Sequence, residues 1–287
     1  MSPRISFEVF PPRTPEGELR LQETLDRLMP LAPSFVSVTC GAGGSATDAT
    51  FGVLESLAAR GTVPAAGHLT CVGRSRTDTD NEIVRYWNAG VRHIVALRGD
   101  VPGWDGPFEP HADGYASSVE LVTAIRNLAP FEVSVAAYPE PHPDSHSVLH
   151  DLHVLARKAE AGATRAITQF CFDTDAIAEL RARIDGAGIP LTVVPGILLA
   201  TDFGGVSRMA QRCGASIPGW LGQRFAGLDD DPQTRKLVGA IVAAEQVERL
   251  RRDGFEEFHF YTLNQGELAP AVCRLLEGAP VSERSAA

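Results

Sequence analysis

Runs of apolar residues long enough for a strand alternate eight times with longer amphipathic runs along this chain, and this alternation restricts the possible folds more than any other feature. The predicted strands cover residues 4–10, 35–40, 64–71, 93–100, 132–139, 165–172, 191–198 and 257–264. The predicted helices that follow them cover residues 16–29, 48–59, 78–89, 117–127, 147–161, 175–187, 232–253 and 267–277, with one or more short helices before the seventh of these. Eight strand–helix units in roughly 250 residues indicate the α/β class and a (β/α)8 TIM barrel. A doubly wound parallel sheet is the alternative.

The composition agrees with one domain of enzyme size. The chain has 287 residues, 44% of them hydrophobic, which is sufficient for a large buried core. We predict a single catalytic domain over residues 1–278 and a disordered tail over residues 279–287. The net charge of −10, without any basic run interleaved with aromatic residues, argues against a nucleic-acid partner.

Nothing in the sequence predicts export or a membrane partner. The apolar stretches are far shorter than the roughly 20 residues of a membrane helix. The N-terminal residues lack the apolar segment of a signal peptide. The five cysteines are widely spaced and form no C-x-x-C pair, which is typical of reduced thiols. We therefore expect a cytoplasmic protein.

The glycine cluster in FVSVTCGAGGSA, residues 35–46, matches the G-x-G-x-x-G/A pattern of dinucleotide-binding βαβ units. That pattern normally follows the first strand of its fold, and an acidic residue ends the next strand. Here the glycines follow the second predicted strand, and the next strand ends in GHLTC. We interpret the cluster as a loop at the rim of a barrel, where glycine lets the backbone approach a ligand closely. The dinucleotide-binding unit is the less favoured alternative.

The carboxyl ends of the strands form the active site of a TIM barrel. In this sequence they carry a mostly polar set: Glu8, Thr39, His68, Thr70, Arg98, Asp100, Tyr138, Gln169, Pro195 and Asn264. Glu8 lies between Phe7 and Val9, and strand alternation places Phe10 on its face. Apolar surroundings predict a raised pKa for this carboxyl group and a role as general acid. The alternative is a structural glutamate that faces solvent or pairs with an arginine.

Three further motifs permit both a functional and a structural interpretation. The stretch HPDSHSVLHDLH places His146 and His150 at helical spacing, but no H-E-x-x-H motif or nearby cysteine accompanies them, and we predict no metal site. Arg157 and Lys158 can hold an anionic group such as a pyrophosphate, or form part of a solvated helix face. The segment LRGD, residues 97–100, is either a simple turn or part of the rim.

The motifs SFEVFPPRT, FVSVT-GAGGS, HLTC, GVRHIVALRGD, SVAAYPE-HP, RAITQFCFD, VPGIL and FHFYTLN occur in this order between Ile5 and Leu276. Together they closely resemble the catalytic barrel of the bacterial methylenetetrahydrofolate reductases. The resemblance implies an FAD-dependent oxidoreductase, acting on CH–NH donors, that reduces 5,10-methylenetetrahydrofolate to 5-methyltetrahydrofolate in one-carbon and methionine metabolism. It implies NADH, or NADPH, as co-substrate, a ping-pong hydride transfer and a homo-oligomer whose partner is a small-molecule folate.

The same resemblance implies roles for individual residues. Glu8 matches the general acid, Asp100 matches an aspartate beside the flavin and the folate, and Gln169 matches a glutamine that contacts both substrates. The FAD-contacting positions are Thr39, His68, Leu97, Arg98, Gly99, Asp100, Tyr115, Ala116, Tyr138, His142, Asp151, Arg157 and Lys158. Tyr261 and Gln265 fall on the substrate side, together with Glu8, Asp100 and Gln169.

Four positions depart from the family pattern. Cys40 replaces a frequent tyrosine, Val154 an asparagine expected at the flavin, Met209 an aromatic residue and Gln265 a common arginine. These departures concern substrate affinity and the choice between NADH and NADPH.

Two other classes of function compete with the reductase. An aldolase or lyase would need a Schiff-base lysine or metal ligands at the rim, and the two lysines, Lys158 and Lys236, do not end a strand. A non-catalytic folate- or flavin-binding protein is the third hypothesis, which the acid at the rim disfavours.

Overall fold

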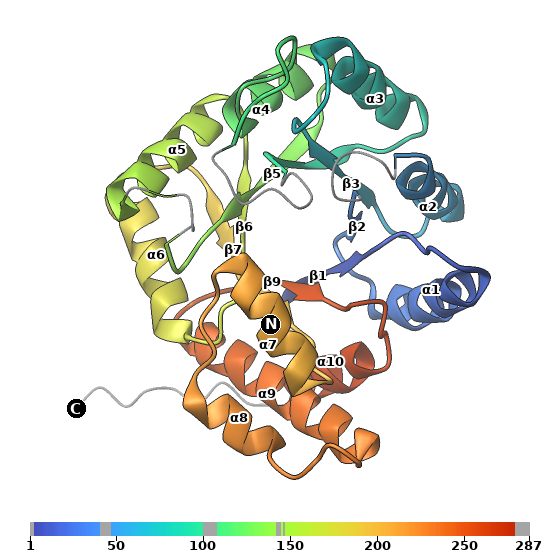
Figure 1. Cartoon of the computed structure of the whole chain (residues 1–287), viewed down its shortest axis with the longest axis vertical. Helices are drawn as coiled ribbons and strands as arrows, with labels where there is room; N and C mark the ends of the chain where they lie inside the picture. Colours follow the sequence, from blue (N-terminus) through green and yellow to red (C-terminus); the bar gives the residue numbers. More distant parts are fainter. Residues whose placement is uncertain (1–2, 41–46, 100–107, 142–144, 146, 279–287) are drawn as a thin grey trace.

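The computed structural model describes residues 3–40, 47–99, 108–141, 145 and 147–278. Within them, nine parallel strands form one sheet that curls into a nearly closed barrel (Figure 1), in the order β7-β6-β5-β4-β3-β2-β1-β9-β8. The strands are β1 (Arg4–Val9), β2 (Val36–Val38), β3 (Ala65–Thr70), β4 (His93–Leu97), β5 (Glu132–Ala137), β6 (Arg165–Thr168), β7 (Thr192–Val194), β8 (Gly196–Leu198) and β9 (Glu257–Tyr261). The predicted TIM barrel is confirmed, and the doubly wound sheet is excluded.

The seventh predicted strand, residues 191–198, is wrong in one respect, because it is two strands rather than one. β7 pairs with β6, and β8 pairs with β9. Pro195 separates them, since proline has no N–H to continue the ladder of hydrogen bonds. Its carbonyl group accepts a hydrogen bond from the backbone N–H of His259 at 2.9 Å. The two edges of the sheet are therefore consecutive in the chain, and this continuity closes the barrel.

Helices surround the strands (Figure 1). The predicted helix positions are confirmed to within two residues at each end. The helices are α1 (Pro15–Leu28), α2 (Thr47–Arg60), α3 (Arg76–Asn88), α4 (Ser118–Leu128), α5 (Val148–Glu160), α6 (Thr174–Gly186), α7 (Phe203–Cys213), α8 (Gly219–Phe225), α9 (Pro232–Arg252) and α10 (Leu268–Gly278), with a 3₁₀ turn η1 (Met29–Leu31). Among the described residues, none of these helices has the length and apolar character to cross a membrane.

Local sequence explains where several helices begin. Ser117 precedes α4, and its hydroxyl accepts the N–H of Glu120. The Asp231 carboxylate caps α9 in the same manner, and Pro232 occupies the first turn, where no intrahelical partner for its N–H is required. Both signals lie within three residues of the helix start that they stabilise.

The inside of the barrel contains both apolar and polar side chains. The apolar ones form a separate cluster of buried residues, Phe35, Ala66, Val95, Ile167 and Val194. Buried serine and histidine side chains from β1, β2, β4, β5 and β9 share the interior: Ser6, Ser37, His93, Ser134 and His259. Phe35 stacks on the ring of His259 and contacts that of His93 edge-on, so the apolar and polar side chains are interleaved.

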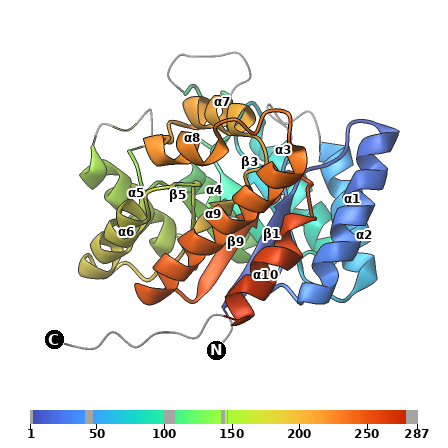
Figure 2. The same ribbon diagram turned by 90° about the horizontal axis from the view of Figure 1, so that it is seen from below.

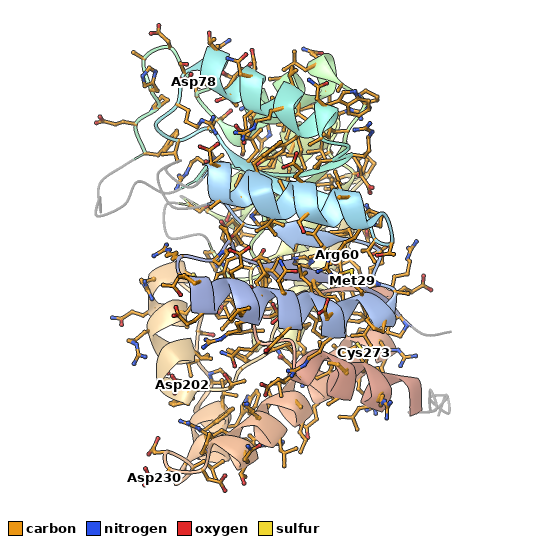
Figure 3. The ribbon with its side chains drawn as sticks, turned by 90° about the vertical axis from the view of Figure 1, so that its right-hand side faces the viewer. Met29, Arg60, Asp78, Asp202, Asp230 and Cys273 are labelled. Carbon is orange, nitrogen blue, oxygen red and sulfur yellow. The ribbon has the colours of Figure 1, made fainter. Side chains whose placement is uncertain are left out.

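The two ends of the barrel differ in what covers them. Figure 2 shows α7 and α8 across the end at which the strands finish. In Figure 3, Asp78 and Asp202 lie on that side, whereas Met29, Arg60 and Cys273 lie toward the opposite end. The candidate site is at the first of these ends, because it receives the carboxyl ends of all strands.

Candidate active site

Glu8 lies near the carboxyl end of β1, beside Ser37 of β2 and Tyr261 of β9 in the strand register. Its Oε2 atom is 3.3 Å from Nε2 of His68 and 3.8 Å from Nε2 of His259. Two imidazoles from β3 and β9 therefore converge on one carboxylate oxygen. Among the described residues, the ion-pair partners of Glu8 are these histidines rather than an arginine.

The prediction of a raised pKa for Glu8 is wrong. Burial does raise the pKa of this carboxyl group, but the interactions with the imidazoles of His259 and His68 outweigh burial and hold the pKa at about 2. The alternation of residues along β1 shows the apolar neighbours of Glu8 in the sequence. It does not show the imidazoles of His68 and His259, which come from other strands of the sheet. The carboxylate form of Glu8 is therefore favoured in this structure, and the group must take up a proton before it can act as an acid.

The network behind Glu8 was missed by the sequence analysis. Nδ1 of His259 lies 2.8 Å from the hydroxyl oxygen of Ser6, and its Nε2 lies 3.5 Å from that of Ser37. The signal was present in the alternation of EFHFY and ISFEV, which places His259 on the face of Tyr261, and Ser6 on the face of Glu8. Only the pairing of β1 with β9 shows that these two faces meet.

A cavity between β4, β5 and α5 gathers six of the predicted cofactor-contacting residues. They are Leu97, Arg98, Gly99, Tyr138, Asp151 and Lys158, and Val154 also lines this cavity. Gly99 has φ = 84°, and a Cβ atom there would lie 2.5 Å from Val72 and 2.8 Å from Thr70. Glycine is therefore required at this turn.

Lys158 is the buried cation of the cavity. Its Nζ donates a hydrogen bond to the carbonyl oxygen of Ala136 at 3.1 Å. Burial, with a smaller contribution from the charge of Arg98, lowers the pKa of Lys158 to about 8, although Asp151 opposes this change. A buried ammonium group, a nearby carboxylate and a glycine turn fit a ligand that carries both phosphate and hydroxyl groups. FAD has these groups, so the residues present fit this cofactor.

Five other predicted cofactor positions do not line this cavity, and one of them is His68, which lies beside Glu8. Thr39 follows β2 near Glu8, and the hydroxyl of Tyr115 donates a hydrogen bond to Asp80 at 2.6 Å. The backbone N–H of Ala116 donates to a glutamate carboxylate at the start of α4, and the side chain of Arg157 is exposed. Two more predicted positions, Asp100 and His142, lie outside the described residues, as do the glycines of residues 41–46 and His146.

The predicted substrate-side residues form hydrogen bonds with the backbone or with a neighbouring loop. Oε1 of Gln169 accepts the N–H of the next residue at 3.0 Å. The hydroxyl of Tyr261 donates to the carbonyl oxygen of Thr168 at 2.7 Å, and Oε1 of Gln265 accepts the hydroxyl of Thr201 at 2.7 Å. A small cavity lined by Gln169 and Tyr138 adjoins the larger one through Tyr138.

Two predicted rim residues have structural roles. Pro195 separates β7 from β8. The side chain of Asn264 accepts the N–H of Phe10 at 3.0 Å and donates to its carbonyl oxygen at 2.8 Å. Asn264 therefore fixes the chain directly after β1, close to Glu8.

The described residues contain no group of three or more His, Cys, Asp or Glu side chains arranged to hold a metal ion. Of the four histidines in HPDSHSVLHDLH, His150 and His153 are among the described residues. The absence of a metal site from this protein stays a prediction.

Comparison with known proteins agrees with the resemblance seen in the motifs. The sequence model of the methylenetetrahydrofolate reductases matches residues 1–277. The chain belongs to this family.

Relatives in the family include the 5,10-methylenetetrahydrofolate reductase of Escherichia coli strain K12, which is 45% identical over 276 residues. The alignment covers 96% of this chain and 91% of that protein. The methylenetetrahydrofolate reductase (NADH) 1 of Arabidopsis thaliana is 33% identical, over 90% of this chain and 46% of that protein. The family match extends over all the strands and helices described above, except the last residue of α10.

Solved structures share the fold at low sequence identity. A protein of Clostridium thermocellum that binds two copies of 5-methyl-5,6,7,8-tetrahydrofolic acid has a TM-score of 0.59 and 14% identity, over 96% of this chain and 94% of that one. The dihydropteroate synthase of Xanthomonas albilineans has a TM-score of 0.51 and 15% identity, over 97% and 94% of the two chains. These similarities support the barrel architecture.

Proposed function

We propose that this protein reduces 5,10-methylenetetrahydrofolate to 5-methyltetrahydrofolate, with FAD as bound cofactor and NADH, or NADPH, as reductant. The observation that carries the proposal is the family match over residues 1–277, on a barrel with an acid at its rim. When bound, FAD supplies the hydride transfer between the nicotinamide and the folate in two half-reactions. The homo-oligomeric assembly, the cytoplasmic location, the single domain over residues 1–278 and the preference for NADH belong to the same proposal and rest on the resemblance.

The cavity beside α5 is the proposed cofactor site. The ammonium group of Lys158 would neutralise the pyrophosphate, and the carboxylate of Asp151 would accept hydrogen bonds from hydroxyl groups. Gly99 keeps the backbone close to the ligand, because no side chain fits at this turn. Tyr138 borders both this cavity and the smaller one, so it can contact the cofactor and the substrate.

Glu8 is the proposed acid of the folate half-reaction. Opening of the five-membered ring of the substrate requires a proton on the departing nitrogen, and it leaves an iminium group that accepts the hydride. The carboxyl group of Glu8 lies at the rim with its side chain about one-fifth exposed, where a substrate can reach it. Gln169, on the adjoining small cavity, offers an amide that can orient the folate.

The visible absorption spectrum of the purified protein tests the cofactor and both half-reactions. We expect flavin bands that bleach with NADH under anaerobic conditions and return when methylenetetrahydrofolate is added. A colourless protein that FAD does not reconstitute would overturn the flavin assignment. Flavin that NADH reduces and the folate does not reoxidise would overturn the substrate assignment.

The variant Glu8→Gln tests the acid. We expect reoxidation by the folate to slow by at least about 100-fold, while reduction by NADH continues, since only the folate half-reaction needs a proton donor. Glu82→Gln is the matched control, because it makes the same change at a buried glutamate on α3. Full folate turnover by Glu8→Gln would disprove the acid role.

A further inference from the structure

The imidazole of His68 has an unusual environment for a buried polar group. Its Nε2 atom is inaccessible to solvent and has no hydrogen-bond partner among the described residues. It nevertheless lies 3.3 Å from Oε2 of Glu8, without the alignment of a hydrogen bond. Leaving a buried donor or acceptor unsatisfied costs about 1–3 kcal/mol. Such groups call for an explanation, and a role in catalysis is one of them.

The second imidazole beside Glu8 differs in this respect. His259 is fully buried, and its Nδ1 is held by the hydroxyl of Ser6 at 2.8 Å. Burial lowers the pKa of His259, so this ring resists taking up a proton. The side chain of His68 is 9% exposed and keeps a small contact with the rim. His259 is therefore suited to hold the Glu8 carboxylate in position, and His68 is suited to exchange a proton with it.

From this geometry we propose that His68 and Glu8 share the proton of the folate half-reaction, and that His68 returns a proton to Glu8 after each turnover. The inference rests on the proposed function and deepens it. Glu8 gives its proton to the substrate nitrogen and becomes a carboxylate. The imidazolium form of His68 then transfers the proton on Nε2 to Oε2 of Glu8 and becomes neutral, and the pair regains a proton from solvent through the Glu8 carboxyl group, whose side chain is about one-fifth exposed at the rim. Each turnover consumes one proton, as reduction of the methylene group by NADH requires.

Electrostatics support a stored proton at this position. The two imidazoles keep the pKa of Glu8 low, so without a substrate the carboxylate does not retain a proton at neutral pH. An imidazole is the side-chain group suited to exchange protons near neutrality. A substrate that excludes water would favour transfer of the proton to Glu8, because desolvation disfavours an ion pair. Among the described residues, the other titratable groups that interact electrostatically with Glu8 or His68 are His259 and Tyr261 of β9, His93 of β4 and Cys40 after β2.

The first test follows folate-dependent reoxidation of the reduced flavoprotein from about pH 5 to 9. In His68→Gln we expect the rate at neutral pH to fall at least about ten-fold. We also expect the alkaline limb of the profile to move to lower pH by at least about one unit, because Glu8 then acts beside His259 alone, without the proton that His68 supplies. Imidazole added to His68→Ala should restore part of the rate.

His93→Gln is the matched control, since it removes another buried imidazole of the barrel, one that contacts Ser134 rather than Glu8. Its pH profile should keep the wild-type shape. A uniform loss of rate in His68→Gln, with the wild-type profile and no rescue by imidazole, would show a structural role and overturn the proposal.

A second readout does not depend on turnover. Infrared titration of the flavoprotein, with the spectrum of Glu8→Gln subtracted, follows the Glu8 carboxyl group directly. Its pKa should rise in His68→Gln, because burial remains and one imidazole is removed. If His68→Gln does not fold, His68→Asn replaces it. An unchanged pKa of Glu8 in His68→Gln would overturn the proposed coupling of the two residues. Wild-type protein that fails to reduce the folate would overturn the proposed function instead. The infrared titration would still test the coupling of His68 and Glu8 in that case.

Discussion

The hydroxyl of Tyr261 on β9 donates a hydrogen bond to the carbonyl oxygen of Thr168 on β6, at 2.7 Å. These strands are not neighbours in the sheet, because β7 and β8 lie between them on either side of Pro195. The Thr168 hydroxyl also accepts the N–H of Gly196 at 2.9 Å. The side chains of Tyr261 and Thr168 thus connect β6 to β9 and to β8 at the point where the backbone hydrogen bonds of the barrel are interrupted. This point lies directly beside the candidate site.

Gly196→Ala should destabilise the protein by about 1–3 kcal/mol, the usual cost of overpacking a filled interior. A Cβ atom at this position would lie 2.2 Å from the Thr168 carbonyl oxygen and 2.5 Å from the ring of Tyr261. Urea unfolding measures the change in free energy. Gly52→Ala is the control, since Gly52 is exposed on α2 with no atom within 4 Å of the new methyl group. Equal stabilities for the two variants would contradict the prediction.

His93 should make the protein less stable in acid. Burial, and to a smaller extent the charge of Arg165, lowers the pKa of His93 from 6.5 to about 3. Below pH 6.5 His93 binds a proton in the unfolded chain but not in the folded protein. The free energy of unfolding therefore falls as the pH falls from 6.5 toward 3.

His93→Gln should reduce this loss by up to about 1.4 kcal/mol per pH unit. The effect of His93 can be measured above pH 4.5, because the lowered pKa of Glu8 changes stability only below its ordinary value of 4.5. The measurement is unfolding free energy against pH, with the exposed His153→Gln as control. An identical slope in His93→Gln and wild type would refute the assignment.

Lys158 should make flavin binding depend on pH. Its pKa of about 8 means that the ammonium group loses its proton as the pH rises above 8, and an anionic ligand then loses its counter-charge. We expect FAD affinity to fall above about pH 8 in the wild type. In Lys158→Met the affinity should be at least about ten-fold weaker and independent of pH across this range.

Equilibrium dialysis of the flavin measures both effects. The control is Lys236→Met, which removes the other lysine of the chain, an ion-pair partner of Glu267 on the outer surface. A wild-type affinity for Lys158→Met would argue that the cavity beside α5 holds a different ligand.

Glu257 connects strands across the end of the barrel opposite the candidate site. Its carboxylate pairs with Arg4 of β1 and, at 3.1 Å, with Arg165 of β6, which also pairs with Glu132 of β5. Because the side chain of Glu257 is 12% exposed, Glu257→Gln should cost about 1–3 kcal/mol in unfolding free energy. Glu179→Gln breaks only an exposed pair within α6 and should cost less than about 0.5 kcal/mol. Similar losses in both variants would show that the network adds nothing beyond a surface pair.

The sequence by itself was enough for the architecture, because its signals are short-range. Apolar runs of strand length predict the strands, and longer amphipathic runs predict the helices that follow them. Chain order then placed Glu8 at the carboxyl end of the first strand and Lys158 on the helix after the fifth strand. Each of these inferences needs only residues within a few positions of one another.

What surrounds Glu8 could be decided only by the tertiary structure. His68 and His259 are distant from Glu8 in the sequence, and only the pairing of β1 with β9, and the closure of the barrel, brings their Nε2 atoms to one carboxylate oxygen. The direction of the Glu8 pKa was therefore mispredicted, since the apolar neighbours along a strand are visible in the sequence and the partners across a barrel are not. The break at Pro195 has the same origin. Local propensity favours one strand over residues 191–198, and the geometry of closing the sheet divides it into two.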